Sequence, residues 1–224
     1  MSVFLPFVTS SLDPEDLRLI DAFEPAMRSL LPAQDEPVHA EVLLALCLGD
    51  GLLEVLEWSR EGTGADPAAS MWLAALRWHK VVTGGFPVGA PQPRPRPTDH
   101  ALRLIVESAG LELIPGSADT SLASLATAEM GTRGAPPQPE VDDDAALLRI
   151  LPISLVPYVE DSMKQSWAEQ AICLTHGNRR LLRESRRRAV EVPDPAQHGA
   201  SHELLNVVVE DLSKRWRKTT LPGS

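Results

Sequence analysis

The 224-residue sequence has only two cysteines, Cys47 and Cys173. Neither has a second cysteine at the C-x-x-C spacing of redox and zinc motifs, and both lie in apolar stretches. We therefore expect two buried free thiols rather than a disulfide or a metal-binding pair. Phosphate-binding motifs are also absent. The sequence contains neither G-x-G-x-x-G nor a Walker sequence, which excludes nucleotide binding by those two routes.

Long apolar runs are missing as well. None reaches the roughly 18 residues that a membrane-spanning helix needs. The N-terminus, M-S-V-F-L-P-F-V-T-S-S-L, lacks the positively charged start of a signal peptide. These two absences predict a cytoplasmic protein without membrane association.

Basic residues are too few for a general nucleic-acid binder, because the formal net charge is −10. The charge is uneven: residues 1–144 hold 22 acids and 9 bases, whereas residues 145–224 hold 9 acids and 12 bases. An arginine-rich stretch in the second part is either a solvated helix face or a docking surface for an acidic partner. Its candidate partner-binding residues are Arg179, Arg183, Arg186 and Arg187.

What is present is helical periodicity. Apolar residues recur at helical spacing, no strand-like alternation is convincing, and 43% of the residues are hydrophobic. The sequence therefore predicts one all-α domain over residues 1–224, a compact helical bundle with loops near 84–98 and 131–143. Within the first loop, Arg94 and Arg96 are expected to be exposed.

Several helix starts and one central helix can be placed. Asp13–Pro14 and Asp66–Pro67 each combine a capping aspartate with a proline in the first helical position. Pro25 is expected to kink or end the first of these helices. The stretch Val42–Leu56 is apolar nearly all round, which predicts a central buried helix.

Three consecutive carboxylates, Asp142, Asp143 and Asp144, stand directly before an apolar run. Such a cluster either holds a cation or starts a helix. Three adjacent carboxylates cannot all face one ion on an ordinary backbone, so we interpret them as a helix start. In this interpretation Asp144 is the cap, while Asp142 and Asp143 remain candidate ligand-binding residues.

Four stretches stand out together: L-A-L-C-L-G-D-G-L-L-E at 44–54, P-G-S-A-D-T-S-L-A-S-L-A-T-A-E-M-G-T at 115–132, D-D-D-A-A-L-L-R-I-L-P-I-S-L at 142–155 and A-E-Q-A-I-C-L-T-H-G at 168–177. In this order they resemble motifs of the ADP-ribosylglycohydrolase family. The resemblance implies an all-α, magnesium-dependent hydrolase that removes ADP-ribose from modified proteins or nucleotides. It further implies two metal ions, held by a T-D-D-T motif and a D-x-D-T motif, and a substrate loop that ends in M-R.

The sequence departs from the family where the chemistry should be. The T-D-D-T position falls on G-T-G-A-D-P-A-A-S, where Asp66 alone remains, and no D-x-D follows residue 144. The small residues of the family's substrate loop are replaced around Asp143–Ala146, where acidic side chains would repel a diphosphate. Arg149 matches the family's substrate-loop arginine, so it is a candidate ligand-binding residue, with a buried ion pair as the alternative. We assign no metal ligands.

Two functional hypotheses follow. In the first, this is a degenerate, C-terminally shortened member that binds a small ligand or a protein partner and needs no cofactor. In the alternative, it is an active hydrolase of an ADP-ribose-like N-glycoside, with Mg²⁺ and with Asp66 and Asp50 as the candidate catalytic residues. His176, in T-H-G, has no second ligand at metal spacing and is expected to be structural.

Assembly is also expected. The family has further helices beyond T-H-G, and this chain has few, which leaves apolar surface to be covered. We therefore expect a homo-oligomer or an obligate protein complex, with Trp216 and the arginine-rich helix near the contact.

Overall fold

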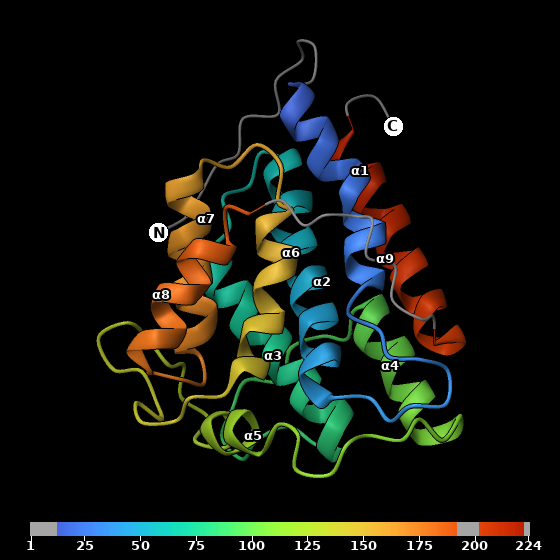
Figure 1. Cartoon of the computed structure of the whole chain (residues 1–224), viewed down its shortest axis with the longest axis vertical. Helices are drawn as coiled ribbons and strands as arrows, with labels where there is room; N and C mark the ends of the chain where they lie inside the picture. Colours follow the sequence, from blue (N-terminus) through green and yellow to red (C-terminus); the bar gives the residue numbers. More distant parts are fainter. Residues whose placement is uncertain (1–12, 192–201, 222–224) are drawn as a thin grey trace.

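The computed structural model describes residues 13–191 and 202–221, and within these ranges every regular element is a helix. Figure 1 shows their arrangement. In chain order they are α1 (Pro14–Arg28), α2 (Ala40–Arg60), α3 (Pro67–Thr83), α4 (Pro97–Ser108), α5 (Asp119–Leu125), the 3₁₀ helix η1 (Asp144–Ile150), α6 (Leu151–Ser154), α7 (Asp161–Cys173), α8 (Arg179–Arg188) and α9 (Glu203–Thr220). The predicted all-α class is confirmed.

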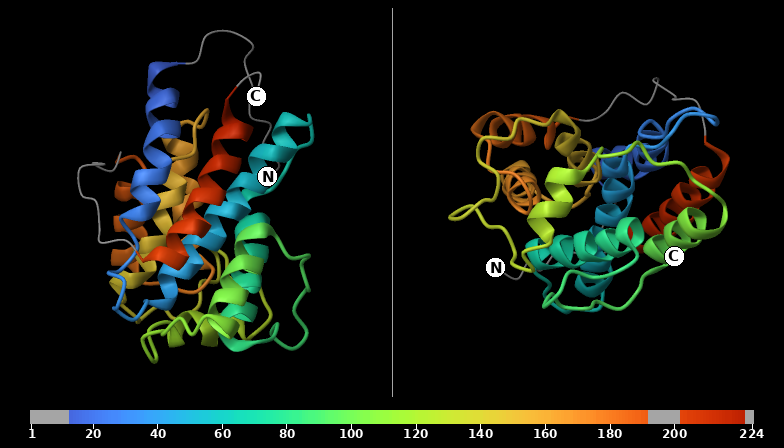
Figure 2. Two further views of the ribbon diagram at one scale, coloured as in Figure 1. Left: turned by 90° about the vertical axis from the view of Figure 1, so that its right-hand side faces the viewer. Right: turned by 90° about the horizontal axis from the view of Figure 1, so that it is seen from below.

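Helix α2 is the centre of the bundle. It packs against α3, α4, α6, α9 and η1. Figures 1 and 2 show α1 and α9 side by side on one flank of α2, and α7 with α8 on the other. Leu43, Leu44, Leu46 and Leu48 are all fully buried, and each buried leucine contributes about 1.5–3 kcal/mol. The prediction of a central buried helix is confirmed.

The chain's own helices cover the apolar part of α2 up to Leu56, although Trp58 near its end is 42% exposed, and this cover removes one reason for expecting assembly. Its apolar residues between Val42 and Leu56 are at most 4% exposed. Trp216 is equally inaccessible, because its ring stacks on Phe23 with 4.0 Å between the ring centroids. The Trp216 ring itself therefore offers no surface to a partner, and assembly stays a prediction.

Helix starts follow the predicted chemistry. Asp13 Oδ1 accepts a hydrogen bond from the Glu15 amide at 2.9 Å, and Asp66 Oδ1 accepts one from the Ala68 amide at 3.0 Å. In both helices a proline fills the next position, where an N–H would have no helical partner. Pro25 does not end α1, which continues to Arg28. Packing of α1 along α9 keeps the helix going past the missing amide.

The connection between α3 and α4 is ordered by charge. Arg96 was expected to be exposed, but its side chain is only 15% accessible and donates from Nε to Asp50 Oδ1 at 2.9 Å. It also bonds to Glu57 Oε2 at 3.0 Å. The buried carboxylate of α2 draws this guanidinium inward, so the proline-rich connection is anchored to the central helix.

Among the described residues, no helix is both long and apolar enough to cross a membrane.

Candidate functional site

A pocket of about 380 Å³ opens at the start of α3. It is formed by three segments: the first turn of α3, the connection that follows Met130, and the middle of α7. Its lining residues are Asp66, Pro67, Ala68, Thr132, Arg133, Gly134, Ser166, Trp167 and Gln170. We call it the Asp66 pocket. It brings together Asp66, which was a candidate catalytic residue, and the predicted loop near 131–143.

Close backbone packing positions the loop wall of this pocket. A Cβ atom added to Gly131 would lie 2.1 Å from the Cys173 carbonyl oxygen, so only glycine fits there. Gln170 Nε2 donates to the Gly131 carbonyl at 2.9 Å, which ties the same turn to α7. Arg133 donates from Nη2 to the carbonyl and to the hydroxyl of Ser166, and its Nε lies 3.4 Å from Glu169. The wall is therefore held by polar contacts to a rigid helix.

The residues of the Asp66 pocket do not fit the two magnesium ions that the resemblance implies. Asp66 is the one carboxylate in the lining, and its Oδ1 is used to cap α3. The positions after it are proline and alanine, which offer no side-chain oxygen. Among the described residues, no group of three or more His, Cys, Asp or Glu side chains could hold a metal ion. The donor set is that of a polar ligand pocket, not of a dimetal centre.

Asp50, the second candidate catalytic residue, lies elsewhere, on α2 facing α4 and α9. It is 2% exposed, and its Oδ1 accepts from Arg96 at 2.9 Å and from Arg215 at 2.8 Å. Its Oδ2 accepts from the Thr98 amide at 3.1 Å. Burial alone would raise the pKa of Asp50, but Arg215 and Arg96 outweigh burial and hold it below the usual value. Its contacts are those of a structural ion pair.

Arg149 is fully buried and does not line the Asp66 pocket. Its Nη2 lies 2.5 Å from Glu41 Oε2, and its Nη1 donates to Thr175 Oγ1 at 2.6 Å. Ser121 bonds to the same carboxylate and accepts from Arg149 Nη2 at 2.9 Å. The structure therefore shows the buried ion pair, which was the alternative interpretation of this residue.

His176 lies at the edge of the same network. Its Nδ1 is 2.8 Å from Thr175 Oγ1, and its Nε2 is buried without a hydrogen-bond partner among the described residues. Burial and the positive charge of Arg149 lower the pKa of His176 to about 4, against a smaller opposite effect of Asp143. The imidazole is therefore neutral at physiological pH, as expected of a structural histidine.

The three aspartates form a helix start, but with a different cap from the one expected. Asp143 is the N-cap: its Oδ1 accepts from the Ala145 amide at 3.0 Å. Asp142 and Asp144 both turn to Arg180, at 2.7 Å and 2.5 Å. The expectation that Asp144 caps was wrong, because Asp144 already has helical geometry as the first residue of η1. Arg180 holds the pKa of Asp142 below its usual value through a hydrogen bond.

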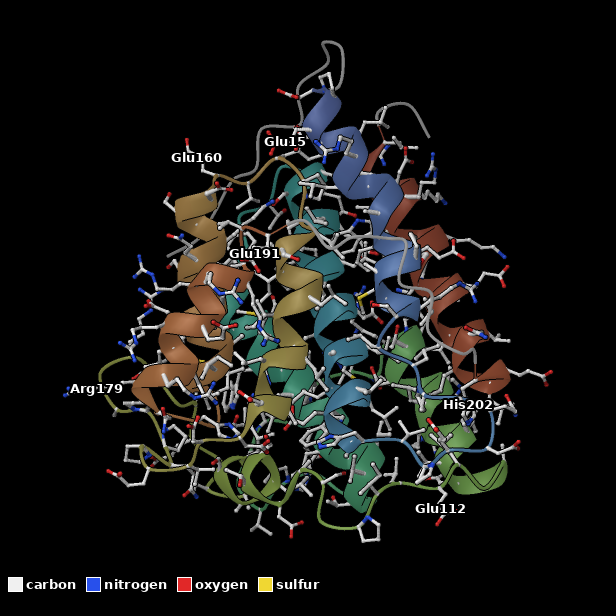
Figure 3. All side chains as sticks on the ribbon, in the orientation of Figure 1. Glu15, Glu112, Glu160, Arg179, Glu191 and His202 are labelled. Atoms are coloured by element: carbon white, nitrogen blue, oxygen red, sulfur yellow. The ribbon has the colours of Figure 1, made fainter. Side chains whose placement is uncertain are left out.

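The arginine-rich stretch is helix α8. Arg187 and Arg188 pair with Glu184, and Arg186 pairs with Glu169 at 3.1 Å. Arg179 and Arg183 are exposed, and no hydrogen bond or ion pair to either is found among the described residues. Figure 3 shows Arg179 projecting outward from the molecule. The candidate partner-binding residues thus lie on one helix with an exposed face. Glu169 and Glu184 neutralise part of its positive charge.

Sequence reasoning missed residues whose role depends on tertiary contacts. These are Glu41, Ser121 and Thr175 around Arg149, and Arg133, Ser166 and Gln170 in the Asp66 pocket. One signal was available: Glu41 and Arg149 are lone opposite charges in apolar helical runs, and burial of either requires a partner. No local pattern marks the pocket residues.

Comparisons with family models, with curated proteins and with solved structures found no match to the chain. Function is therefore inferred from this chain's own side chains and their geometry.

Proposed function

We propose that this chain is a degenerate ADP-ribosylglycohydrolase-like protein that has lost dimetal hydrolysis and binds a small polar ligand of the ADP-ribose type in the Asp66 pocket. The observation that carries the proposal is the lining of that pocket. It has one carboxylate, already used as a helix cap, where two-metal hydrolysis needs several.

The remaining chemistry of the pocket suits a sugar phosphate. Thr132 and Ser166 offer hydroxyl groups and Gln170 offers an amide, which are groups that hydrogen-bond to ribose. Arg133 supplies a positive charge, and the amino end of the 17-residue helix α3 adds the positive end of its dipole. The Trp167 ring, which is 7% exposed, adds an apolar wall. Binding without turnover is what this set supports.

Calorimetric titration with ADP-ribose, with and without magnesium, tests the proposal. We expect saturable binding that does not require magnesium. Arg133→Ala and Gln170→Ala should each weaken it about tenfold, which is the loss of one hydrogen bond to a charged or well-oriented group. Arg186→Ala is the matched control, because Arg186 also pairs with Glu169 but does not line the pocket. Absence of binding, or equal loss in the control, contradicts the proposal.

A protein partner is the second candidate function, and α8 is the observation that favours it. Arg179 and Arg183 are exposed on the same face without a partner among the described residues. The helix ends beside a groove of about 460 Å³, whose floor includes Leu147, Leu148 and Leu151 and whose rim includes Arg187 and Arg188. An acidic surface with apolar side chains would complement both features, either from another protein or from a second copy of this chain.

A further inference from the structure

Residues of α1 and α9 line a second pocket. Figures 1 and 2 show these two helices on the opposite flank of α2 from α8. The volume of this pocket is about 330 Å³. Its lining residues are Ile20, Asp21, Phe23, Glu24, Pro25, Arg28, Ser213 and Arg217. We call it the α1–α9 pocket. Neither the family resemblance nor the Asp66 pocket accounts for it.

A buried hydroxyl without a partner marks this pocket as a binding site. Ser213 is 6% exposed, and its Oγ has no hydrogen-bond partner among the described residues. Two other buried hydroxyls bond to the preceding helical turn: Thr220 Oγ1 donates to the Trp216 carbonyl at 2.9 Å, and Ser185 Oγ to the Leu182 carbonyl at 2.9 Å. Ser59 Oγ on α2 is, like Ser213 Oγ, buried without a partner among the described residues, but it lines none of the pockets described in this structure. Ser213 makes no such bond although it lines the pocket. A buried polar group left unpaired costs about 1–3 kcal/mol, so a ligand that bonds to it gains affinity.

The backbone of α1 supplies a second acceptor in the same place. Pro25 has no N–H, so the Asp21 carbonyl cannot receive its usual helical hydrogen bond from residue 25. Both residues line the pocket. The pocket therefore contains a hydroxyl and a carbonyl that intrahelical bonding does not consume.

The charges around the pocket are of both signs and balance. Asp21 pairs with Arg217 at 2.6 Å across the seam, and Glu24 pairs with Arg28 at 2.8 Å. Each carboxylate has one oxygen outside these bonds, namely Asp21 Oδ2 and Glu24 Oε2. Arg217 uses Nη1 for its bond to Asp21, so its Nη2 and Nε lie outside that pair. The pocket can thus receive a cationic group at the carboxylates and an anionic group at Arg217.

The inner wall is apolar. Ile20 and Phe23 are 3% and 1% exposed. The Phe23 ring stacks on the Trp216 ring, with an angle of 15° between the two ring planes. A rigid aromatic and aliphatic wall favours a ligand with an apolar side group. The pocket's volume, its charges of both signs and its apolar wall together fit a small ligand that carries both charges and an apolar side group.

We propose that the α1–α9 pocket binds a small zwitterion of the amino-acid class. Its ammonium group bonds to Asp21 and Glu24, its carboxylate bonds to Arg217 and Ser213, and its side chain lies against Ile20 and Phe23. The α1–α9 pocket shares no lining residue with the Asp66 pocket, so a test of amino-acid binding does not depend on the proposed function.

Titration of the full chain with single L-amino acids, followed by calorimetry and by backbone amide shifts, tests this site. We expect millimolar or tighter binding by apolar amino acids, weaker binding by glycine, and shifts centred on α1 and α9. Each buried methylene should strengthen binding by up to about fourfold. Ethylamine and propionate, each carrying one of the two charged groups, should bind far more weakly than the amino acid.

Three variants make the test specific. Asp21→Asn and Arg217→Gln should each weaken binding about tenfold, since each removes one charge-assisted bond, and Ser213→Ala should weaken it as well. Ser185→Ala and the Arg103→Gln, Glu107→Gln pair are the controls, because they remove a buried hydroxyl and an exposed ion pair away from the pocket.

The following outcomes overturn the proposal. One is that no amino acid binds at millimolar concentration, which would leave Ser213 as an unpaired buried hydroxyl of the bundle. Another is that ethylamine binds as tightly as the amino acid, which would make this a simple cation site. The last is that binding persists unchanged in all three variants, or maps to the Asp66 pocket.

Discussion

Arg149 and Glu41 form a fully buried ion pair, with 2.5 Å between Nη2 and Oε2, that joins η1 to the first turn of α2. Residues 41 and 149 are far apart in sequence and come together at the centre of the bundle. Ser121 and Thr175 add hydrogen bonds to the pair, while Arg149 Nε is buried without a partner among the described residues. Four separate segments therefore meet at one charge pair.

Removing one member of this pair should be strongly destabilising. Arg149→Met leaves the Glu41 carboxylate buried and unpaired, which costs about 3–5 kcal/mol. Urea unfolding of the variant measures the loss. Arg180→Met is the matched control, because its pair with Asp142 and Asp144 is exposed and screened by solvent, so its loss should change stability little. A loss from Arg149→Met no larger than that from the control would show that the buried pair does not hold these segments together.

The two neighbouring aspartates at the start of η1 should differ in their effect on stability. Asp143→Ala removes the capping bond to the Ala145 amide and should cost about 0.5–2 kcal/mol of unfolding free energy. Asp144→Ala removes only an exposed contact to Arg180 and should cost less than about 1 kcal/mol. Chemical unfolding of both variants decides the order. The reverse order would mean that Asp144 is the functional cap in solution.

Stability should fall in acid because of His176. Its folded pKa of about 4 lies below the ordinary value of 6.5, so the folded state favours the neutral imidazole. The associated stability is fully present above pH 6.5 and is lost as the pH falls towards about 4. Urea midpoints across this range measure it. His176→Gln should flatten that part of the profile, whereas the exposed His100→Gln should not. An unchanged slope in His176→Gln would assign the acid sensitivity to other groups.

No magnesium-dependent release of ADP-ribose from arginine-linked or serine-linked substrates is expected, because the Asp66 pocket lacks the ligands for two ions. A release assay measures it. Asp66→Ala and Asp13→Ala form a matched pair, since both aspartates cap a helix ahead of a proline but only Asp66 lines the pocket. Turnover above background that Asp66→Ala abolishes and Asp13→Ala preserves would establish the alternative, an active hydrolase.

The sequence predicted features that depend on neighbouring residues. Asp13 and Asp66 cap as expected because a cap needs only its own turn and the proline that follows. The burial of α2 followed from its composition, since a helix apolar all round has no face for water.

Features that depend on distant contacts were not predictable in the same way. Arg96 is drawn inward by Asp50, and that contact spans two connections and another helix. The cap of η1 shifted by one residue because a 3₁₀ start leaves no sequence mark that separates Asp143 from Asp144. The Asp66 pocket is formed by residues from three segments, so no single stretch of the sequence predicts it.

The last prediction concerns assembly through α8. If its exposed arginines contact an acidic surface, reversing Arg183, Arg186 and Arg187 to glutamate should weaken association, and the effect should be greater at low salt because screening is weaker there. Native mass and sedimentation of the purified chain, alone and from lysate, measure association. The control reverses Arg18, Arg94 and Arg103, which changes the net charge by the same amount on other helices and loops. Equal weakening in both triples would attribute the effect to overall charge, because only a specific contact distinguishes α8 from other arginines. A monodisperse monomer that associates with nothing would leave α8 as a solvated face, on which Arg186 and Arg187 pair with Glu169, Glu184 and Glu191 of the same chain.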